Sequence, residues 1–340
     1  MASSPPYPLH ESIVDRLDPT YKAFYNTHLI DKQVVHHQPI AASRASGTLI
    51  PGAGPLLPVS HTMDMTIPRK ETQGPDIPIR VFFPHGAAPA KGWPLCFWFH
   101  GGGWVLGNID TENVIATNLC NRVECVVITV DYRLAPEHPF PAAIDDCWEA
   151  FLWVLSTGSS ALRLDISRLA LGGSSAGANI TTVLAQRIVD RPGTPGIACQ
   201  LLSVPVADNT AEVGSRDPAH ASWTENEFTP ALPAEKMMWY RRHYLPDPTT
   251  RAHPEASPLL WKCDWSKMPP AIMVLGELDV LRSEGEALGK KMKDAGVSVQ
   301  TTIMKGQPHP FIAMDGVLED GKRAITLFVD GLKWMLCDTI

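Results

Sequence analysis

The twelve residues LALGGSSAGANI (169–180) combine an apolar strand, a cluster of small residues and the start of a helix. Within them, GSSAG (173–177) matches the pattern G-x-S-x-G, in which the central serine sits on a sharp, strained turn between strand and helix. The residues two before and two after that serine must be small, because the strand and helix backbones nearly touch there. Ser175 has glycine at both positions and is therefore the better candidate nucleophile, whereas Ser174 fits the pattern less well.

Apolar segments typical of buried strands alternate with helical patterns over most of the chain. The alternation predicts an α/β fold with a mainly parallel sheet and helices on both faces, because parallel strands are buried on both sides and therefore nearly continuously apolar. Strands are expected at 94–99, 125–132, 168–173, 199–207, 272–275 and 297–304, and helices at 142–155, 178–189, 283–295 and 321–336.

Two regions do not follow this alternation, the N-terminal stretch and the segment that begins at Asp208 and is rich in aromatic residues and methionine. We expect residues 1–50 and 208–250 to form a helical cap over the carboxyl edge of the sheet. Residues 51–207 and 251–340 would then form the catalytic domain. The alternative is a peripheral helical decoration that packs on the core.

The glycine-rich stretch HGGGW (100–104) follows the expected strand 94–99. Glycines at this place leave backbone N–H groups accessible to a substrate oxygen, which is the requirement for an oxyanion hole. The expected donors are the N–H groups of Gly102, Gly103 and Ala176, the last at the start of a helix whose dipole favours negative charge. The alternative interpretation is a flexible turn.

An acid and a base should follow the serine in the order Ser, Asp or Glu, His. Glu277 and Asp279 both lie in GELDVL (276–281), directly after an expected strand, and compete for the acid role. His309 lies in GQPHPF (306–311), after the next expected strand, where the base should be. His309 would take the proton of Ser175, and the acid would fix the tautomer of the imidazole and stabilise its charged form.

Together these motifs resemble the hormone-sensitive-lipase-like family of α/β-hydrolases over roughly residues 60–340. The resemblance rests on HGGGW, GSSAG, GELDVL and GQPHPF, and on DYRLAPEHPFPAAIDD (131–146). It implies the α/β-hydrolase fold, with a mostly parallel eight-stranded sheet flanked by helices and a helical cap from the N-terminus and an insertion after the sixth strand. The family pattern D-x-L assigns the acid to Asp279, and the 131–146 segment would support the oxyanion loop. Ser174 departs from the Asp or Thr that relatives often have there.

The resemblance implies a serine carboxylesterase that hydrolyses short- to medium-chain acyl esters through an acyl-enzyme. A deacetylase or lactone hydrolase dedicated to one small metabolite would use the same triad. A non-catalytic homologue that binds a small molecule is the alternative from a different class, and an intact triad argues against it. The cap would line the substrate pocket, and the expected lining residues are Trp104, Trp223, Phe228, Met238 and Trp239.

The composition limits which classes of binding partner and which cellular compartment are expected. The net charge is −7 and no lysine or arginine cluster stands out, which argues against nucleic acid as a partner. The first residues show neither a basic n-region nor an apolar h-region, so no secretory signal is expected. The sequence contains no apolar run long enough to span a membrane, and its seven cysteines are dispersed, so a cytoplasmic enzyme is expected. The expected partner is a small-molecule ester, and some members of the family also form homodimers.

No cofactor and no metal are expected. His36 and His37 are adjacent but lack a supporting carboxylate or cysteine cluster in the sequence. Glu284 and Glu286 are interpreted as the solvated start of a helix.

Overall fold

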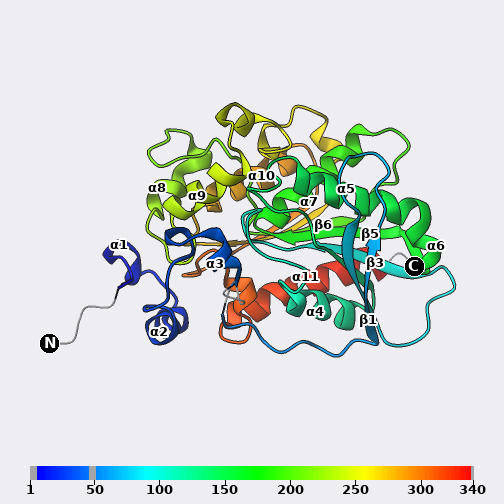
Figure 1. Cartoon of the computed structure of the whole chain (residues 1–340), viewed down its shortest axis with the longest axis horizontal. Coiled ribbons are helices and arrows are strands. Elements are labelled where there is room, and N and C mark those ends of the chain that lie inside the picture. The colour runs from blue at the N-terminus through cyan, green and yellow to red at the C-terminus, as the bar shows by residue number, and fades with distance from the viewer. Residues whose placement is uncertain (1–5, 46–50, 338–340) are drawn as a thin grey trace.

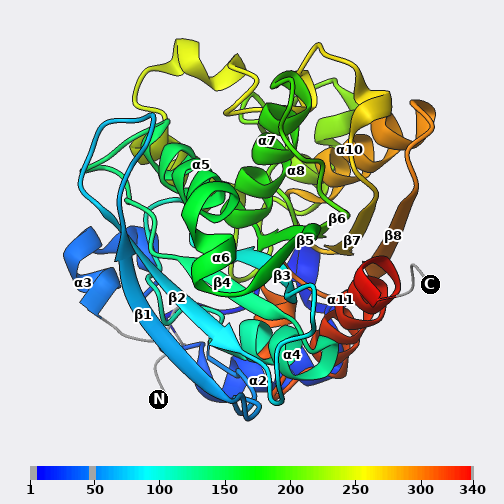
Figure 2. The ribbon, with the colours of Figure 1, turned by 90° about the vertical axis from the view of Figure 1, so that its right-hand side faces the viewer.

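The computed structural model describes residues 6–45 and 51–337, and its centre is a single eight-stranded sheet (Figures 1 and 2). The strand order is β1-β2-β4-β3-β5-β6-β7-β8, with the first two pairings antiparallel and the others parallel. The predicted mostly parallel eight-stranded sheet is therefore confirmed. The strands are β1 (His61–Ile67), β2 (Ile77–Phe83), β3 (Trp93–Phe99), β4 (Val126–Val130), β5 (Leu164–Ser174), β6 (Cys199–Ser203), β7 (Ala271–Gly276) and β8 (Val299–Met304).

Helices cover both faces of the sheet (Figure 1). One face packs against α4 (Asn113–Val123) and α11 (Glu319–Cys337), and the other against α5 (Ala142–Trp153), α7 (Ala176–Asp190) and α10 (Arg282–Asp294). The remaining α-helices are α1 (Glu11–Val14), α2 (Pro19–His28), α3 (Ile40–Ala45), α6 (Ser159–Ala161), α8 (Ala221–Glu225) and α9 (Ala234–Tyr244), and the short 3₁₀ helix η1 spans Val35–His37. None of the helices in the described ranges is long and apolar enough to cross a membrane.

Strand β6 is shorter than the sequence predicts, because the chain turns directly after Ser203. The apolar pattern predicts a strand over 199–207, but β6 ends at Ser203. Val204 then adopts a positive φ of 40°, and the proline that follows cannot donate a hydrogen bond to a sheet. The turn leaves the Ser203 carbonyl free to accept a 2.8 Å hydrogen bond from the N–H of Ser175.

The two regions that break the alternation are helical, and they lie on one side of the sheet (Figure 1). The N-terminal region contributes α1, α2, η1 and α3, and the segment that begins at Asp208 contributes α8 and α9. The division of the chain into a cap and a catalytic domain stays a prediction. Its parts at residues 1–5, 46–50 and 338–340 lie outside the described residues.

Candidate active site

Ser175 lies on the turn between β5 and α7, in a conformation that side chains seldom adopt. Its φ is 56° and its ψ is −114°, and the residue is only 7% exposed. Such strained residues persist only where the surrounding structure holds them, and they concentrate at functional sites. Here the strand and helix on either side hold the turn, together with the hydrogen bond to Ser203.

The glycines on both sides of Ser175 are required by contact between backbones. A Cβ atom on Gly173 would lie 2.4 Å from the carbonyl of Gly177, and one on Gly177 would lie 1.9 Å from the carbonyl oxygen of Phe99. Neither contact can be relieved by a side-chain rotation, because the opposing atoms belong to the backbone. The G-x-S-x-G pattern is thus a steric consequence of how closely β3, β5 and α7 approach.

The structure brings Ser175, His309 and Asp279 together, although they come from three separate loops. His309 Nε2 lies 2.8 Å from Ser175 Oγ, and His309 Nδ1 lies 2.7 Å from Asp279 Oδ2. All three side chains are buried. The competing carboxylate of Glu277 turns elsewhere, toward the N–H of Gly306 at 2.8 Å and the ammonium of Lys305 at 3.1 Å.

The loop after β3 places free N–H groups beside the serine. Gly102 and Gly103 line the same cavity as Ser175 and have φ values of 119° and 60°. A Cβ on Gly102 would lie 2.2 Å from the carbonyl oxygen of Leu106, so the loop tolerates no side chain there. Among the described residues, no acceptor within the chain engages the N–H groups of Gly102, Gly103 or Ala176. Ala176 also begins α7, where the helix dipole favours negative charge.

The segment 131–146 and helix α3 hold this loop from behind. The Tyr132 hydroxyl donates to the carbonyl of His100 at 2.8 Å, and the N–H of Ala135 donates to the carbonyl of Trp104 at 2.8 Å. Arg44 Nε donates to the carbonyl of Val105 at 3.0 Å. The His100 side chain is buried inside the loop, and burial lowers its pKa to about 4, so the ring is neutral around pH 7.

Glu112 is a component of this site that sequence reasoning missed. It lines the cavity and accepts hydrogen bonds from Trp98 Nε1 at 2.8 Å and from the N–H of Gly101 at 3.3 Å. Burial raises the pKa of its carboxyl group to about 7, opposed by its hydrogen bonds with Trp98, Gly101 and Ser174. A single glutamate in a polar loop forms no recognisable sequence pattern, so only the fold shows that its carboxyl group contacts Gly101, the residue before Gly102 and Gly103.

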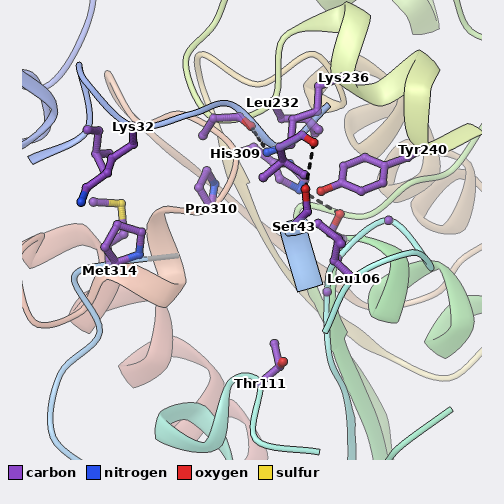
Figure 3. A pocket seen from close by; sticks show the side chains of 18 of the residues that line it. Lys32, Ser43, Leu106, Thr111, Leu232, Lys236, Tyr240, His309, Pro310 and Met314 are labelled. Atoms are coloured by element: carbon purple, nitrogen blue, oxygen red, sulfur yellow. Dashed lines mark hydrogen bonds between the residues drawn. The ribbon is translucent and has the colours of Figure 1, made fainter. Parts of the chain in front are cut away.

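A cavity of about 710 Å³ opens above Ser175, and it is large enough for a small organic ester. Its walls come from distant parts of the sequence, which Figure 3 shows as side chains converging from several elements. The lining includes Tyr21, Phe24, His28, Leu29 and Lys32 from the N-terminal region, Leu232, Lys236, Met237 and Tyr240 near or on α9, and Pro310 and Met314 after β8.

None of the five side chains predicted to line the pocket is among the cavity-lining residues in the described part of the chain. Trp104 is fully buried and stacks on Tyr244, with ring centroids 4.0 Å apart. Trp223 is also buried, with its Nε1 donating to Glu284 at 3.0 Å. Phe228 is 48% exposed and lines a smaller neighbouring pocket.

The orientation of α9 explains the other two placements. Met237 and Tyr240, three residues apart on one helix face, line the cavity. Met238 and Trp239 are on the other faces: the sulfur of Met238 lies 3.3 Å from the guanidinium of Arg241, and Trp239 packs edge-on against Tyr240. The aromatic content of the segment predicts that it lines the cavity, but it does not predict which face of α9 does so.

The segment after Asp208 also holds the loop that carries Asp279, and no sequence pattern signals this contact. Asn226 Nδ2 donates to the carbonyls of Glu277 at 3.1 Å and Asp279 at 3.0 Å. Asn226 Oδ1 accepts a 3.0 Å hydrogen bond from Arg16 Nη2. The N-terminal region and this segment therefore meet at the loop that carries Asp279.

Glu284 corrects an expectation, because it is fully buried rather than solvated. Its carboxylate accepts hydrogen bonds from the N–H of Ala207 at 2.8 Å and from Trp223 Nε1 at 3.0 Å. Burial raises its pKa to about 8. Glu286, two residues on, lies 3.4 Å from Arg282 and is largely exposed.

The two adjacent histidines acquire a carboxylate neighbour that the sequence did not place there. Glu235 Oε2 lies 3.8 Å from His36 Nε2, and Glu235 Oε1 lies 3.7 Å from His37 Nε2. Their candidate ligand atoms all fall within 4.8 Å of one another. Glu235 is largely exposed, and this spacing is also that of a loose ion pair.

A nucleophile elbow, a Ser-His-Asp hydrogen-bonded set and a glycine loop at one edge of a mostly parallel sheet define a hydrolase-type site on an α/β scaffold. Comparison with known proteins agrees, since residues 96–313 match a family described as having the alpha/beta hydrolase fold. The chain belongs to this α/β-hydrolase family, in its hormone-sensitive-lipase-like branch.

Individual relatives cover between three quarters and more than nine tenths of the chain. An AB hydrolase superfamily protein of Schizosaccharomyces pombe is 48% identical over 93% of this chain and 93% of its own length. The ethyl acetate hydrolase of Pseudomonas putida is 31% identical over 76% of this chain and 79% of its own. The solved structure of an esterase from Pyrobaculum calidifontis superposes with a TM-score of 0.81 at 31% identity, covering 94% of this chain and 99% of that one.

Proposed function

We propose that this protein is a serine carboxylesterase that hydrolyses short- to medium-chain acyl esters, with Ser175 as nucleophile, His309 as base and Asp279 as acid. The observation that carries the proposal is the continuous hydrogen-bonded set from Ser175 Oγ through His309 to Asp279, at 2.8 and 2.7 Å. Relatives and solved neighbours named as an ethyl acetate hydrolase and an esterase support the same reaction.

The geometry suits a two-step acyl transfer. His309 Nε2 takes the proton of Ser175 Oγ as this oxygen attacks the ester carbonyl, and the N–H groups of Gly102, Gly103 and Ala176 would receive the oxyanion. The alcohol leaves with the proton from His309, and the acyl group stays on Ser175. Water then attacks the acyl-enzyme with His309 again as base, which releases the acid and restores the serine.

Asp279 is arranged to keep His309 in the correct tautomer. Asp279 Oδ2 contacts the ring, and Oδ1 accepts the N–H of Leu281 at 2.9 Å, so the carboxylate is fixed at both oxygens. The proposed roles of α2, α9 and their neighbours as a cap follow from their side chains on the cavity wall. The cavity volume and the name of the Pseudomonas relative support substrates of modest size.

The test is hydrolysis of p-nitrophenyl esters from acetate to palmitate by the wild type, Ser175→Ala and Ser174→Ala. We expect activity that peaks at the short chains, and a loss of at least about 10⁴-fold in kcat for Ser175→Ala. Ser174→Ala is the matched control and should retain most of the activity.

The outcomes separate the alternatives. Activity that survives in Ser175→Ala and vanishes in Ser174→Ala would contradict the assigned nucleophile. A folded wild type that hydrolyses no p-nitrophenyl ester would contradict the carboxylesterase proposal and favour a metabolite-specific hydrolase or a non-catalytic binding protein.

A further inference from the structure

More cationic than anionic side chains line the cavity above Ser175. Two lysines line it, Lys32 and Lys236, whereas its one carboxylate is that of Glu112. That carboxylate is engaged with protein donors, at 2.8 Å from Trp98 Nε1 and 3.3 Å from the N–H of Gly101. Along the described part of the cavity wall, the groups left to meet a substrate are therefore cationic or neutral.

Lys236 lies close to the oxyanion loop. Tyr240, one helical turn further along α9, packs its ring against Gly103 so closely that a Cβ there would lie 2.3 Å from ring atoms. The ammonium of Lys236 is 5.9 Å from the centroid of the same ring. Figure 3 shows Lys236, Tyr240 and His309 grouped at one end of the cavity, with Lys32 and Met314 at the other.

The Lys236 ammonium has no carboxylate partner among the described residues. Within residues 6–45 and 51–337, its one hydrogen bond goes to the carbonyl oxygen of Ala231 at 2.7 Å, although an ammonium has three N–H donors. The adjacent Glu235 turns away, toward His36 and His37. A partly buried, unpaired ammonium costs folding free energy, and proteins that keep one commonly use it.

We propose that Lys236 determines specificity for a carboxylate on the substrate, so that the preferred substrates are esters carrying a second, anionic group a few bonds from the ester carbonyl. This rests on the proposed esterase function and narrows its substrate class. The cavity can hold both parts of such an ester, with the reacting carbonyl at Ser175 and the carboxylate at Lys236. Lys32, exposed near the opposite end, adds positive potential that attracts an anion.

The titration of Lys236 gives the proposal a signature that a structural lysine lacks. Burial lowers its pKa to about 8, so the charge is present below that pH and lost above it. The titratable groups around it are His36 and His37 on η1, Glu235 and Tyr240 on its own helix, Lys32 after α2, and His309 and Glu112 on the cavity wall. Arginine at position 236 would keep the charge at every pH used and isolate the contribution of Lys236 from these neighbours.

The experiment compares kcat/KM for two pairs of esters that differ by a carboxylate against an isopropyl group of similar shape. Monoethyl glutarate against ethyl 5-methylhexanoate puts the charge in the acyl part, and 4-acetoxybutanoate against 4-methylpentyl acetate puts it in the alcohol part. Acid release is followed in a pH-stat for the wild type, Lys236→Met and Lys236→Arg. Lys290→Met, at an exposed lysine on α10, is the control for loss of a charge elsewhere.

We expect the wild type to favour the charged ester by at least about 10-fold in one pair near neutral pH. Lys236→Met should reduce this ratio about 10- to 100-fold, as for the loss of a hydrogen bond to a charged group. In the wild type the ratio should fall as the pH rises through about 8, and it should fall less in Lys236→Arg. Lys290→Met should leave the ratio unchanged.

The following results would overturn the inference while leaving the esterase proposal intact. One is a wild type that hydrolyses the neutral ester of both pairs at least as well as the charged one. The other is a folded Lys236→Met that loses activity equally toward both members of each pair. If Lys236→Met does not fold, the pH profiles of the wild type and Lys236→Arg decide, because identical profiles contradict the inference. Failure to hydrolyse any of the four esters or the p-nitrophenyl series contradicts the esterase proposal itself.

Discussion

The sheet edge that carries Ser175 and the wall that faces it across the cavity are built in different ways. At the edge, backbone touches backbone: a Cβ on Gly177 would lie 1.9 Å from the Phe99 carbonyl oxygen. At the wall, side chains from α2 and α9 meet, although they are some two hundred residues apart in the sequence. Backbone contact admits one residue type, whereas a wall of side chains admits many. The sheet edge can therefore be recognised in the sequence as a motif, whereas the cavity wall cannot.

The largest effect we expect is at the acid of the triad. Asp279→Asn should lower kcat about 10⁴-fold, because an amide no longer holds His309 in the tautomer that accepts the serine proton. Glu277→Gln is the matched control, because the Glu277 carboxylate lies two residues away in the sequence and contacts Lys305 instead; its kcat should stay within about threefold of wild type. Steady-state kinetics on a p-nitrophenyl ester measures kcat for both variants. Equal losses of kcat would contradict the choice of Asp279 over Glu277 as the acid.

The steric argument for the elbow predicts a large loss of stability. Gly177→Ala should lower the free energy of unfolding by more than about 3 kcal/mol or prevent folding, because the opposing Phe99 and His100 carbonyls belong to the backbone. Gly196→Ala is the control, since nothing lies within 4 Å of a Cβ there. Urea denaturation measures both, and a Gly177→Ala protein as stable as Gly196→Ala would refute the close-approach argument.

The buried His100 predicts how the stability of the fold depends on pH. Its pKa of about 4 in the fold lies below the ordinary 6.5, so the unfolded chain takes up a proton first and stability is lost as the pH falls from 6.5 toward 4. The stability difference between wild type and His100→Asn should shrink by about 2 kcal/mol between pH 7 and 4.5. Urea denaturation at both pH values checks this. A difference that stays constant would mean that His100 titrates alike in both states.

The smallest effect tests the wall itself. Leu232→Ala removes side-chain volume from the cavity and should shift the ratio of kcat/KM between butyrate and octanoate p-nitrophenyl esters about 10-fold toward the longer chain. Trp239→Ala, on another face of the neighbouring helix, should shift it less than about twofold despite the larger truncation. A larger shift for Trp239→Ala than for Leu232→Ala would support the cavity wall that the sequence predicts instead.

The difference between backbone contacts at the sheet edge and side chains on the cavity wall explains which parts of the molecule could be predicted from the sequence. The sheet follows from apolar strands that are buried on both faces. The proposed triad of Ser175, Asp279 and His309 follows from the order of these residues after those strands, and the structure brings their side chains together. The aromatic composition of the segment after Asp208 predicts Phe228 and Trp239 on the cavity wall. Composition indicates hydrophobicity, but it does not indicate how a helix is rotated about its axis. Glu112 and Asn226 could not be foreseen, since each acts through backbone groups that only the fold brings near.

The hydrogen bonds that tie the first helices to the rest of the chain also affect the order of biosynthesis. Arg16 donates to Asn226, and the N–H of Asp18 donates to the carbonyl of Gly306 at 2.9 Å. A ribosome adds residues at about 5–20 per second, so the start of the chain emerges roughly a quarter of a minute to a minute before its last partner. Until that last partner emerges, α1 and α2 lack part of the surface on which they pack, so their docking is complete only when translation is nearly finished.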